Sequence, residues 1–576
     1  MNRFIFFWMV SISYGMLQAQ DIIISGKILH ANSQDVIGGV SISIENHFSQ
    51  VTTDAGGIFN LKFKDLEMGN YILNISKPGF ESQRLPILLD QTILDLGIIM
   101  LIPDVIERQA QLGSVNLNDD QLDDDQIDAG FSSILSAGKD AFLNAAAYDF
   151  SQTYFKPRGY DSQYGKIMIN GIPLNKIYNG RPQWSNWGGL NDVQRNQDFN
   201  FGLTGVDNNF GSLAGSINFV MRASKFSKGA RLTVSTSNRS YRSRIMATYS
   251  SGELNHNWFY AVSLSGRFAE EGYIEGTSYN AKSVFFSVER KINKNHSLNF
   301  AAIYTPNIRG KSAAITDEVF NLKGRKYNSY WGLQGDKIRN SRQRRVKEPI
   351  LMLNHFWSLS GSTKINTNIA YQFGKISNSR IDYNGGANPS PTYYHNLPSY
   401  FFRKEDFKGG YIAQNDFINN GQIDWSSVFD ANITNKNSGI ENAYVLYEDR
   451  NDDKQFTINS IVMIDINEQL SLNGKIAYKR LHSENFANVL DVLGGKGYLD
   501  IDPFGTTEDE KQNNLLNPNR LVGKGDKFKY NFNLNSEIIS AFSQAQFVSN
   551  PIDFFISLQI SSTSHQRVGL YQNGSF

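Results

Sequence analysis

The chain has no cysteine among its 576 residues, which excludes a disulfide scaffold, a thiolate metal site and a cysteine nucleophile. It also lacks an excess of charge, because 56 Lys and Arg stand against 55 Asp and Glu and give a formal net charge of +1. A balanced chain has no general attraction to polyanions, so we expect no nucleic-acid partner. Proline is scarce at 14 residues, whereas glycine supplies 48 and aromatic residues 13%, which is not the composition of a disordered chain.

Long apolar runs are missing after the first residues. Arg3 precedes the apolar run 4–10, and Leu17-Gln18-Ala19 offers a signal-peptidase site, so we predict a signal peptide over residues 1–19. No later window approaches the roughly 20 apolar residues that a transmembrane helix needs. The mature chain is therefore predicted to be exported, and it is either soluble or crosses a membrane as a β-barrel.

Residues 20–102 consist of short alternating segments separated by turn residues. The segments lie at 22–29, 40–46, 57–63 and 70–76, and they predict a small antiparallel β-sandwich of Ig-like or transthyretin-like fold. The order of the strings SGKI, GVSISIEN, TTDAGGIFNL and GNYILNISKPGFES resembles the carboxypeptidase-regulatory-like domain, which has a carbohydrate-binding-like fold. This module stands in front of outer-membrane receptors in Bacteroidota, but elsewhere it accompanies peptidases or carbohydrate-binding regions, so it does not assign a function.

Residues 103–128 are polar and acidic, and six Asp lie between positions 119 and 128. Like charges repel, so this segment is predicted to be a linker. It lacks the spaced oxygen ligands and the glycine turn of an EF-hand loop, and we assign no metal to it. A helix is predicted over 131–148, where apolar residues and alanines recur at helical spacing.

Residues 129–223 carry the most specific pattern in the chain. A predicted strand at 166–169 runs into Asn170-Gly171, a pair that accepts positive φ and closes a tight hairpin. Gly211 and Gly215 lie in a second turn, ahead of a strand at 217–221. The ordered set Arg158-Gly159, KIMINGIPL and FGSLAGSINFVMRAS resembles the α/β plug domain of TonB-dependent outer-membrane receptors.

Residues 224–576 break into eleven segments with period-two alternation, which predict the strands of a transmembrane antiparallel β-barrel. In 363–374 the odd positions are predicted to face lipid and the even positions the lumen. Short and long joints alternate between the segments, as between periplasmic turns and external loops. Eleven strands leave open edges, and receptors of this family have 22 strands, so we expect this sequence to be the N-terminal fragment of a longer receptor. The predicted segments are 229–237, 241–250, 257–268, 281–291, 297–305, 348–359, 363–374, 454–466, 469–481, 527–548 and 551–563.

The resemblance implies energy-coupled import across the outer membrane, with the N-terminal domain in the periplasm. The implied partners are TonB with its inner-membrane energising complex, an extracellular ligand, the lipid bilayer and, in some members, a surface lipoprotein. An outer-membrane adhesion or assembly barrel that transports nothing is the alternative. An enzyme is not expected, because the sequence has neither a zinc-protease constellation among its eight His nor a Gly-x-Ser-x-Gly elbow; we expect no cofactor.

The resemblance also implies site residues. Arg158 and Gly159 match the position that locks plug to barrel, and the TonB box is predicted in 111–117, where Leu112, Val115 and Leu117 alternate. Ligand contacts are expected from the plug apex and external loops, at Arg181, Trp184, Trp187, Tyr393 and Tyr394. Aromatic rings stack on sugars and flat chelates alike, so a glycan, a siderophore, haem and a peptide all remain open. The alternative for these rings is an interfacial girdle or loop packing.

Overall fold

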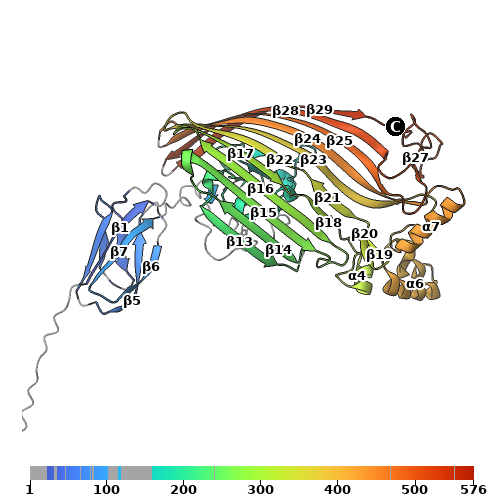
Figure 1. The fold of residues 1–576 in the computed structure, drawn as a ribbon, viewed down its shortest axis with the longest axis horizontal. Helices are drawn as coiled ribbons and strands as arrows, with labels where there is room; N and C mark the ends of the chain where they lie inside the picture. Colours follow the sequence, from blue (N-terminus) through green and yellow to red (C-terminus); the bar gives the residue numbers. More distant parts are fainter. Residues whose placement is uncertain are drawn as a thin grey trace, which may run out of the picture. The chain divides into compact units, whose positions relative to one another are not determined.

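A computed structural model of the chain describes residues 22–30, 36–45, 47, 49–64, 66–77, 80, 83–101, 114–117, 159–200, 202–238, 240–467, 469–549 and 552–575. The chain divides into two compact units, Met1–Gln111 and Leu112–Phe576, and is mainly β as predicted (Figure 1). The predicted signal peptide, most of the acidic linker, the predicted helix 131–148, Leu112 and Arg158 lie outside the described residues.

The first unit is a β-sandwich of two sheets, with strand orders β4-β1-β7 and β3-β2-β5-β6. Alternate residues of its strands point inward; on β4, Phe59, Leu61 and Phe63 are buried while the residues between them are exposed. One expectation is wrong, because β1 and β7 pair in parallel. Between β4 and β7 the chain crosses to the second sheet, so β7 re-enters the first sheet in the direction of β1. The strands are β1 (Ile22–His30), β2 (Ser41–Ile44), β3 (Gln50–Thr52), β4 (Ile58–Phe63), β5 (Gly69–Ser76), β6 (Gln83–Leu89) and β7 (Ile93–Leu101).

The second unit contains a small domain, which we call the inner domain (residues 159–228), and a large curved sheet. A five-stranded sheet of order β10-β9-β12-β11-β8 joins the inner domain to residues 114–117. The predicted hairpin is confirmed: Ile169 pairs with Ile172, and Asn170 and Gly171 have φ of 49° and 80°. The strands are β8 (Ser114–Leu117), β9 (Lys166–Ile169), β10 (Ile172–Pro173), β11 (Gln197–Asn200) and β12 (Ser216–Phe219), and the 3₁₀ turns include η4 (Trp184–Asn186).

The large sheet has 13 strands, of which eleven form one antiparallel path from β13 to β29. Each predicted barrel segment overlaps one strand of this path. Two strands lie off the path, where β18 pairs with β16 and β21, and β21 with β18 and β23. The strands are β13 (Gly229–Thr236), β14 (Ser243–Ser250), β15 (Trp258–Ala269), β16 (Tyr279–Lys291), β17 (His296–Tyr304), β18 (Asn307–Gly310), β21 (Gln343–Lys347), β22 (Ile350–Ser358), β23 (Thr363–Tyr383), β24 (Tyr444–Asp465), β25 (Leu470–Asp491), β28 (Lys527–Ser549) and β29 (Ile552–Gly569).

The two faces of the large sheet differ in chemistry. On β23 the predicted alternation is confirmed, because Asn368 and Gln372 are buried on the inner face while Tyr371 and Phe373 are exposed on the other. Apolar residues recur on the outer face of the other strands, which displays Leu232, Val234, Ile245, Leu264, Val284, Phe286, Leu298, Phe300, Leu351, Leu353, Phe456, Ile476, Ile539, Phe554, Ile556 and Leu558. An exposed apolar band of this extent is typical of a surface that contacts lipid or a partner.

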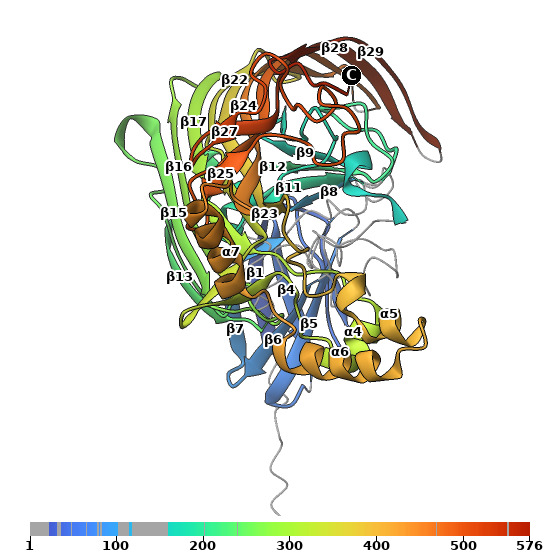
Figure 2. The same ribbon diagram turned by 90° about the vertical axis from the view of Figure 1, so that its right-hand side faces the viewer.

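Long connections leave one end of the large sheet, between β17 and β22, β23 and β24, and β25 and β28. They carry the helices α4 (Asp317–Lys323), α5 (Pro398–Phe402), α6 (Phe407–Asn420) and α7 (Trp425–Asn437) and the hairpins β19 (Trp331–Gln334) to β20 (Lys337–Asn340) and β26 (Tyr498–Leu499) to β27 (Leu521–Val522). Among the described residues, no helix has the length and apolarity needed to span a membrane. The large sheet curves around the inner domain (Figure 2).

Candidate functional site

A row of buried polar side chains crosses the inner face of the large sheet. Glu289, Asn299, Asn354, Asn368 and Asn459 lie on five neighbouring strands, β16, β17, β22, β23 and β24, and each is directly opposite the next. All five are at most 2% exposed. Buried amides need hydrogen-bond partners, and the inner domain supplies part of them.

The Asn170-Gly171 turn of the inner domain sits on this row. Asn170 Nδ2 donates to Asn354 Oδ1 at 3.0 Å, and Asn354 and Asn368 donate onward along the row at 2.8 Å each. Asn459 Nδ2, at the end of this series of hydrogen bonds, donates back to the turn, to the carbonyl of Gly171 at 3.0 Å. Four side chains and one turn therefore form a closed hydrogen-bonded ring across the interface, which polarises and orders its members together.

A buried ion triad forms a second contact between the inner domain and the large sheet. Lys176 Nζ lies 2.5 Å from Glu348 Oε1 and 2.9 Å from Asp453 Oδ2, and all three side chains are at most 5% exposed. Asn186 Nδ2 donates to the other Glu348 oxygen at 2.9 Å. Burial alone would lower the pKa of Lys176, but the two carboxylates raise it above its ordinary value, so the ammonium stays charged.

Arg222, at the end of the inner domain, makes the third contact. Its Nη2 lies 2.5 Å from Glu289 Oε1, its guanidinium carbon lies 3.6 Å from the centre of the Phe356 ring, and the backbone N–H of Ser224 also donates to Glu289. Ser297 Oγ donates to the same carboxylate. Glu289 is fully buried and is held by donors from both the inner domain and the large sheet, which is the arrangement a buried carboxylate requires.

The segment 183–189 contacts the inner face nearer the long connections. Ser283 Oγ donates to the carbonyl of Gly188 at 2.8 Å, and Thr305 Oγ1 donates to the carbonyl of Ser185 at 2.5 Å. Trp187 packs edge-to-face on Trp184, with ring centroids 5.9 Å apart, and is only 2% exposed. The ring of Trp187 is therefore part of the core of this interface and presents almost no surface to solvent.

The other predicted residues occupy three different places. Arg181 is exposed and pairs with Asp161 over 3.5 Å, and Gly159 takes a positive φ of 79°. Tyr393 and Tyr394 lie in the connection between β23 and β24, where they form an aromatic cluster with His395 and Tyr400. Their roles as a lock and as ligand contacts stay predictions.

The two glycines predicted to shape the second turn of the inner domain both take positive φ, 82° at Gly211 and 83° at Gly215. At Gly215 a Cβ would also lie 2.2 Å from the carbonyl oxygen of Asn200, so only glycine fits there. This close approach lets the loop that ends β11 pass directly beside the start of β12.

Val115 and Leu117 of the predicted TonB box lie on β8. This strand forms one edge of the inner sheet, where Val115 pairs with Phe199 and Leu117 with Gln197 of β11. An edge strand offers one row of backbone groups for pairing with another chain. The assignment of the TonB box itself stays a prediction.

Sequence reasoning missed Lys176, Glu348 and Asp453 as well as the row of asparagines. Each Asn of the row stands at an inward position next to at least one apolar residue, as in SLNF, MLNHF and TNIA, and that repeated single amide is the signal that could have indicated a common surface. Among the described residues, no group of three or more His, Asp and Glu is placed to hold a metal ion.

The fold therefore defines a two-unit β protein, whose second unit holds a small mixed-sheet domain against the polar inner face of a curved antiparallel sheet with an apolar outer face. Its first unit is identified by family: residues 24–101 match the CarboxypepD_reg-like domain, which confirms the resemblance found in the sequence. No curated protein matches the chain.

Three of the solved structures that match the chain are 10 to 12% identical to it. The unliganded ferric citrate transporter FecA is 10% identical at a TM-score of 0.44, and the match covers 71% of this chain and 50% of FecA. The pyoverdine outer membrane receptor FpvA from Pseudomonas aeruginosa PAO1 is 11% identical at 0.44, covering 71% and 51%. The ferric-catecholate import receptor Fiu from E. coli K12 is 12% identical at 0.42, covering 71% and 50%. The chain spans about half the length of these proteins.

Proposed function

We propose that this chain is part of a TonB-dependent outer-membrane receptor, which imports an extracellular ligand by energy-coupled displacement of the inner domain. One observation carries the proposal: a separate domain is seated by buried polar contacts on the inner face of a sheet whose outer face is apolar. A lipid-facing sheet explains the exposed apolar band, and a plug explains why the polar face is occupied.

The polar contacts between the inner domain and the large sheet, which are the asparagine row, the Lys176 triad and the Arg222–Glu289 pair, suit a plug that must leave and return. We call these contacts the seat. Ion pairs and amide hydrogen bonds can be exchanged for water when the domain moves, whereas a purely apolar contact would have to expose its surface. The buried triad at Lys176 also makes partial release costly, since breaking one partner of a buried pair leaves an uncompensated charge and costs about 3–5 kcal/mol. Such a seat stays shut until an external source of work acts on it.

TonB would supply that work by pairing with the segment that contains β8. Recognition by strand addition depends on backbone hydrogen bonds, so the side chains of Val115 and Leu117 need only leave the strand extended. β8 is the edge strand next to β11 of the inner sheet, so a pull on it acts directly on the domain to be displaced. In this proposal the first unit lies in the periplasm and the long connections face outward.

TonB dependence is the experiment that tests the proposal. Cells that produce the receptor in a TonB-null background should lose ligand-dependent growth or uptake, while the protein remains in the outer membrane at normal abundance. Uptake that does not depend on TonB would contradict energised import. A protein that promotes attachment or assembly but imports nothing would instead support the adhesion or assembly alternative. No enzymatic activity, cofactor or metal belongs to the proposal.

The ligand of the site remains a glycan, a siderophore, haem or a peptide under this proposal, and a surface lipoprotein is a further partner that the family allows. The exposed Arg181 and the cluster of Tyr393 and Tyr394 are proposed contacts on its path. Trp184 is proposed with them, because its ring is only partly buried where it packs against the inner core.

A further inference from the structure

Two pairs of arginines face one another on the inner face, near the end from which the long connections leave. Arg244 on β14 is directly opposite Arg267 on β15, and Arg309 on β18 is directly opposite Arg344 on β21. Like charges directly opposite each other destabilise an antiparallel pair. We call these four residues the arginine belt.

No described carboxylate forms an ion pair with any member of the arginine belt. Elsewhere in the second unit some arginines are matched with acids, as Arg222 of the inner domain is with Glu289 over 2.5 Å and Arg450 on β24 with Asp452 over 2.6 Å. The belt differs from these two pairs, because the side chains to which Arg344 donates are neutral amides, Gln183 at 2.6 Å and Asn378 at 3.3 Å. Its charge is left for something outside the described chain to neutralise.

Several guanidinium nitrogens of the belt are buried without a hydrogen-bond partner among the described residues. They are Nε of Arg244, Nε and Nη2 of Arg267, and Nε of Arg344. Arg244 is 5% exposed, and among the described residues its guanidinium donates only to the sulfur of Met246, at 3.5 Å. An unsatisfied buried donor carries a desolvation penalty of about 1–3 kcal/mol, and more when it is charged.

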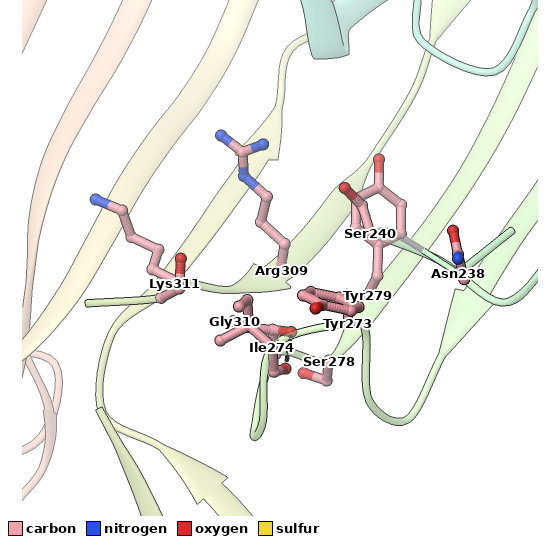
Figure 3. Close-up of a pocket in the computed structure, with 11 residues that line it drawn as sticks. Asn238, Ser240, Tyr273, Ile274, Ser278, Tyr279, Arg309, Gly310 and Lys311 are labelled. Carbon is pink, nitrogen blue, oxygen red and sulfur yellow. Dashed lines mark hydrogen bonds between the residues drawn. The ribbon is translucent and has the colours of Figure 1, made fainter. Parts of the chain in front are cut away.

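A cavity of about 620 Å³ adjoins the belt and is lined by Arg309, Lys311, Tyr273, Tyr279 and Ser278, among others (Figure 3). Arg309 and Lys311 are two residues apart in extended chain, so they share a face, and both side chains extend to the same side of it in Figure 3. Cavities of this size hold small molecules.

Tyr279 joins the cavity to the rest of the belt. Tyr279 lies on β16, directly opposite Arg309 of β18, and its ring centre lies 5.3 Å from the guanidinium carbon of Arg267. Arg267 in turn lies against the inner domain, where a Cβ on Gly189 would be 2.7 Å from its Nε. A ligand that moved Arg267 would therefore act on a contact of the inner domain.

The electrostatics of Lys311 agree with an uncompensated positive region. Partial burial lowers the pKa of this exposed lysine below the ordinary value, and so do Arg344, Arg342 and Arg309 around it. Arg342 adds a further guanidinium, placed 5.2 Å from the centre of the Tyr330 ring. Clefts lined by one sign of charge concentrate ions of the opposite sign and speed their association.

We propose that the cavity and the arginine belt bind a small ligand with at least two anionic groups, carboxylate, phosphate or sulfate. This inference rests on the proposed function and names the chemical class of its ligand. Guanidinium groups bind such anions through paired N–H donors, and Tyr279 presents an aromatic face beside them. A neutral glycan would leave the charge of the belt unbalanced and does not fit.

Calorimetry on the full chain in detergent tests the binding site. The probes are citrate, pyrophosphate and trigalacturonate, with galactotriose as the neutral counterpart of the last. We expect at least one anionic probe to bind, to bind more weakly as NaCl is raised, and to lose about tenfold or more in affinity in the Arg309→Glu/Lys311→Glu double variant, because charge-assisted hydrogen bonds are lost and repulsion is added. Preference among the three probes tells a carboxylate ligand from a phosphate ligand.

Lys294→Glu is the matched control, because Lys294 is an exposed cation in the short turn between β16 and β17, at the opposite end of the sheet. It should bind like the wild type. The proposal is overturned if none of the anionic probes binds, if galactotriose binds as tightly as trigalacturonate, or if the double variant binds like the control. Arg309 and Lys311 are exposed, so the double variant is expected to fold.

Binding in detergent requires no TonB, so this outcome is independent of the import test. Anion binding together with TonB-independent uptake would retain the anion site and refute energised import. TonB-dependent uptake with no anion binding would do the reverse.

Discussion

Lys176 of the inner domain contacts Glu348 of the large sheet over 2.5 Å, although the two are 172 residues apart in sequence and both are buried. Asp453, from another strand, completes the triad. The charge of one ammonium is thus shared between two carboxylates, and Asn186 supports the first of them from the inner domain. Removal of the ammonium would leave two buried acids without the cation that they share.

The first prediction follows from that imbalance. Lys176→Met should lower the free energy of unfolding by about 3–5 kcal/mol and loosen the inner domain, because it leaves Glu348 and Asp453 buried without a cation. Unfolding in detergent, followed by tryptophan fluorescence, measures the first effect. Entry of large antibiotics into cells that produce the variant measures the second, and Arg158→Glu tests the predicted lock in the same assay.

Two variants make this prediction specific. Lys176→Met/Glu348→Gln/Asp453→Asn removes all three charges and should recover most of the loss, since a neutral buried group needs no counter-ion. Lys511→Met breaks an exposed pair with Glu508 and should change neither readout. If Lys176→Met behaved like Lys511→Met, the triad would not hold the inner domain.

The second prediction concerns the middle of the asparagine row. Asn354→Ala removes an acceptor for Asn170 and a donor to Asn368, so these two groups are left buried and unsatisfied. A longer hydrogen bond of 3.4 Å from Asn299 is lost with them. We expect a loss of about 2–6 kcal/mol, as two unpaired polar groups cost roughly 1–3 kcal/mol each. Asn295→Ala, in an exposed turn, is the control. Equal unfolding midpoints for the two variants would show that the row is not a seat.

The strands could be predicted from sequence because their signals are local. Period-two alternation follows from the geometry of a single strand, and the Asn170-Gly171 turn follows from the φ values those residues accept. β23, β24 and β25 continue about ten residues beyond their predicted ends, toward the long connections. Runs of consecutive polar residues such as 448–454 interrupt the alternation there, although pairing continues from 375 to 383.

The seat could not be predicted because it depends on register between distant strands. An inward Asn is visible in one strand, but its position opposite another Asn depends on a pairing that joins residues far apart, such as Asn368 and Asn459. The same limit hid the belt, where Arg309 and Arg344 meet only through the off-path strands β18 and β21. The resemblance to plug domains implies Arg158 as the lock between plug and barrel. The structure instead describes ion pairs of Lys176 and Arg222 between the inner domain and the large sheet.

The third prediction tests the segment around β8. Deletion of residues 111–117 should abolish uptake without lowering surface abundance, because the inner domain would lose the strand on which TonB is proposed to pull. Uptake and cell-surface labelling measure the two effects. A scrambled segment of the same composition without proline is the control, and it should retain most uptake since backbone bonds carry the recognition. Full uptake after the deletion would place the TonB box elsewhere.

The fourth prediction uses the close approach at Gly215. Gly215→Ala places a Cβ against the backbone oxygen of Asn200, at a distance that no side-chain rotation relieves, and in a positive-φ conformation. We expect a loss of about 2–4 kcal/mol, of which about 1–2 kcal/mol is the cost of the left-handed conformation alone. Gly385→Ala has a similar positive φ with open space around it, so it should show only that smaller loss. Equal losses would refute the steric argument.

The fifth prediction is a pH dependence at Asp198 of β11. Burial raises the pKa of this carboxyl to about 6, against the hydrogen bond that Asn218 donates at 2.9 Å, and Asp207 adds to the rise. Because the folded-state pKa lies above the unfolded value of about 4, folding favours the protonated acid; that stability is present below about pH 4 and is lost as pH rises through about 6. Asp198→Asn cannot ionise, so it should gain about 3 kcal/mol relative to the wild type between those limits. Unfolding midpoints measured across this pH range give the gain. Asp336→Asn, in an exposed turn, is the control. A constant difference between Asp198→Asn and the wild type at every pH would show that Asp198 carries no raised pKa.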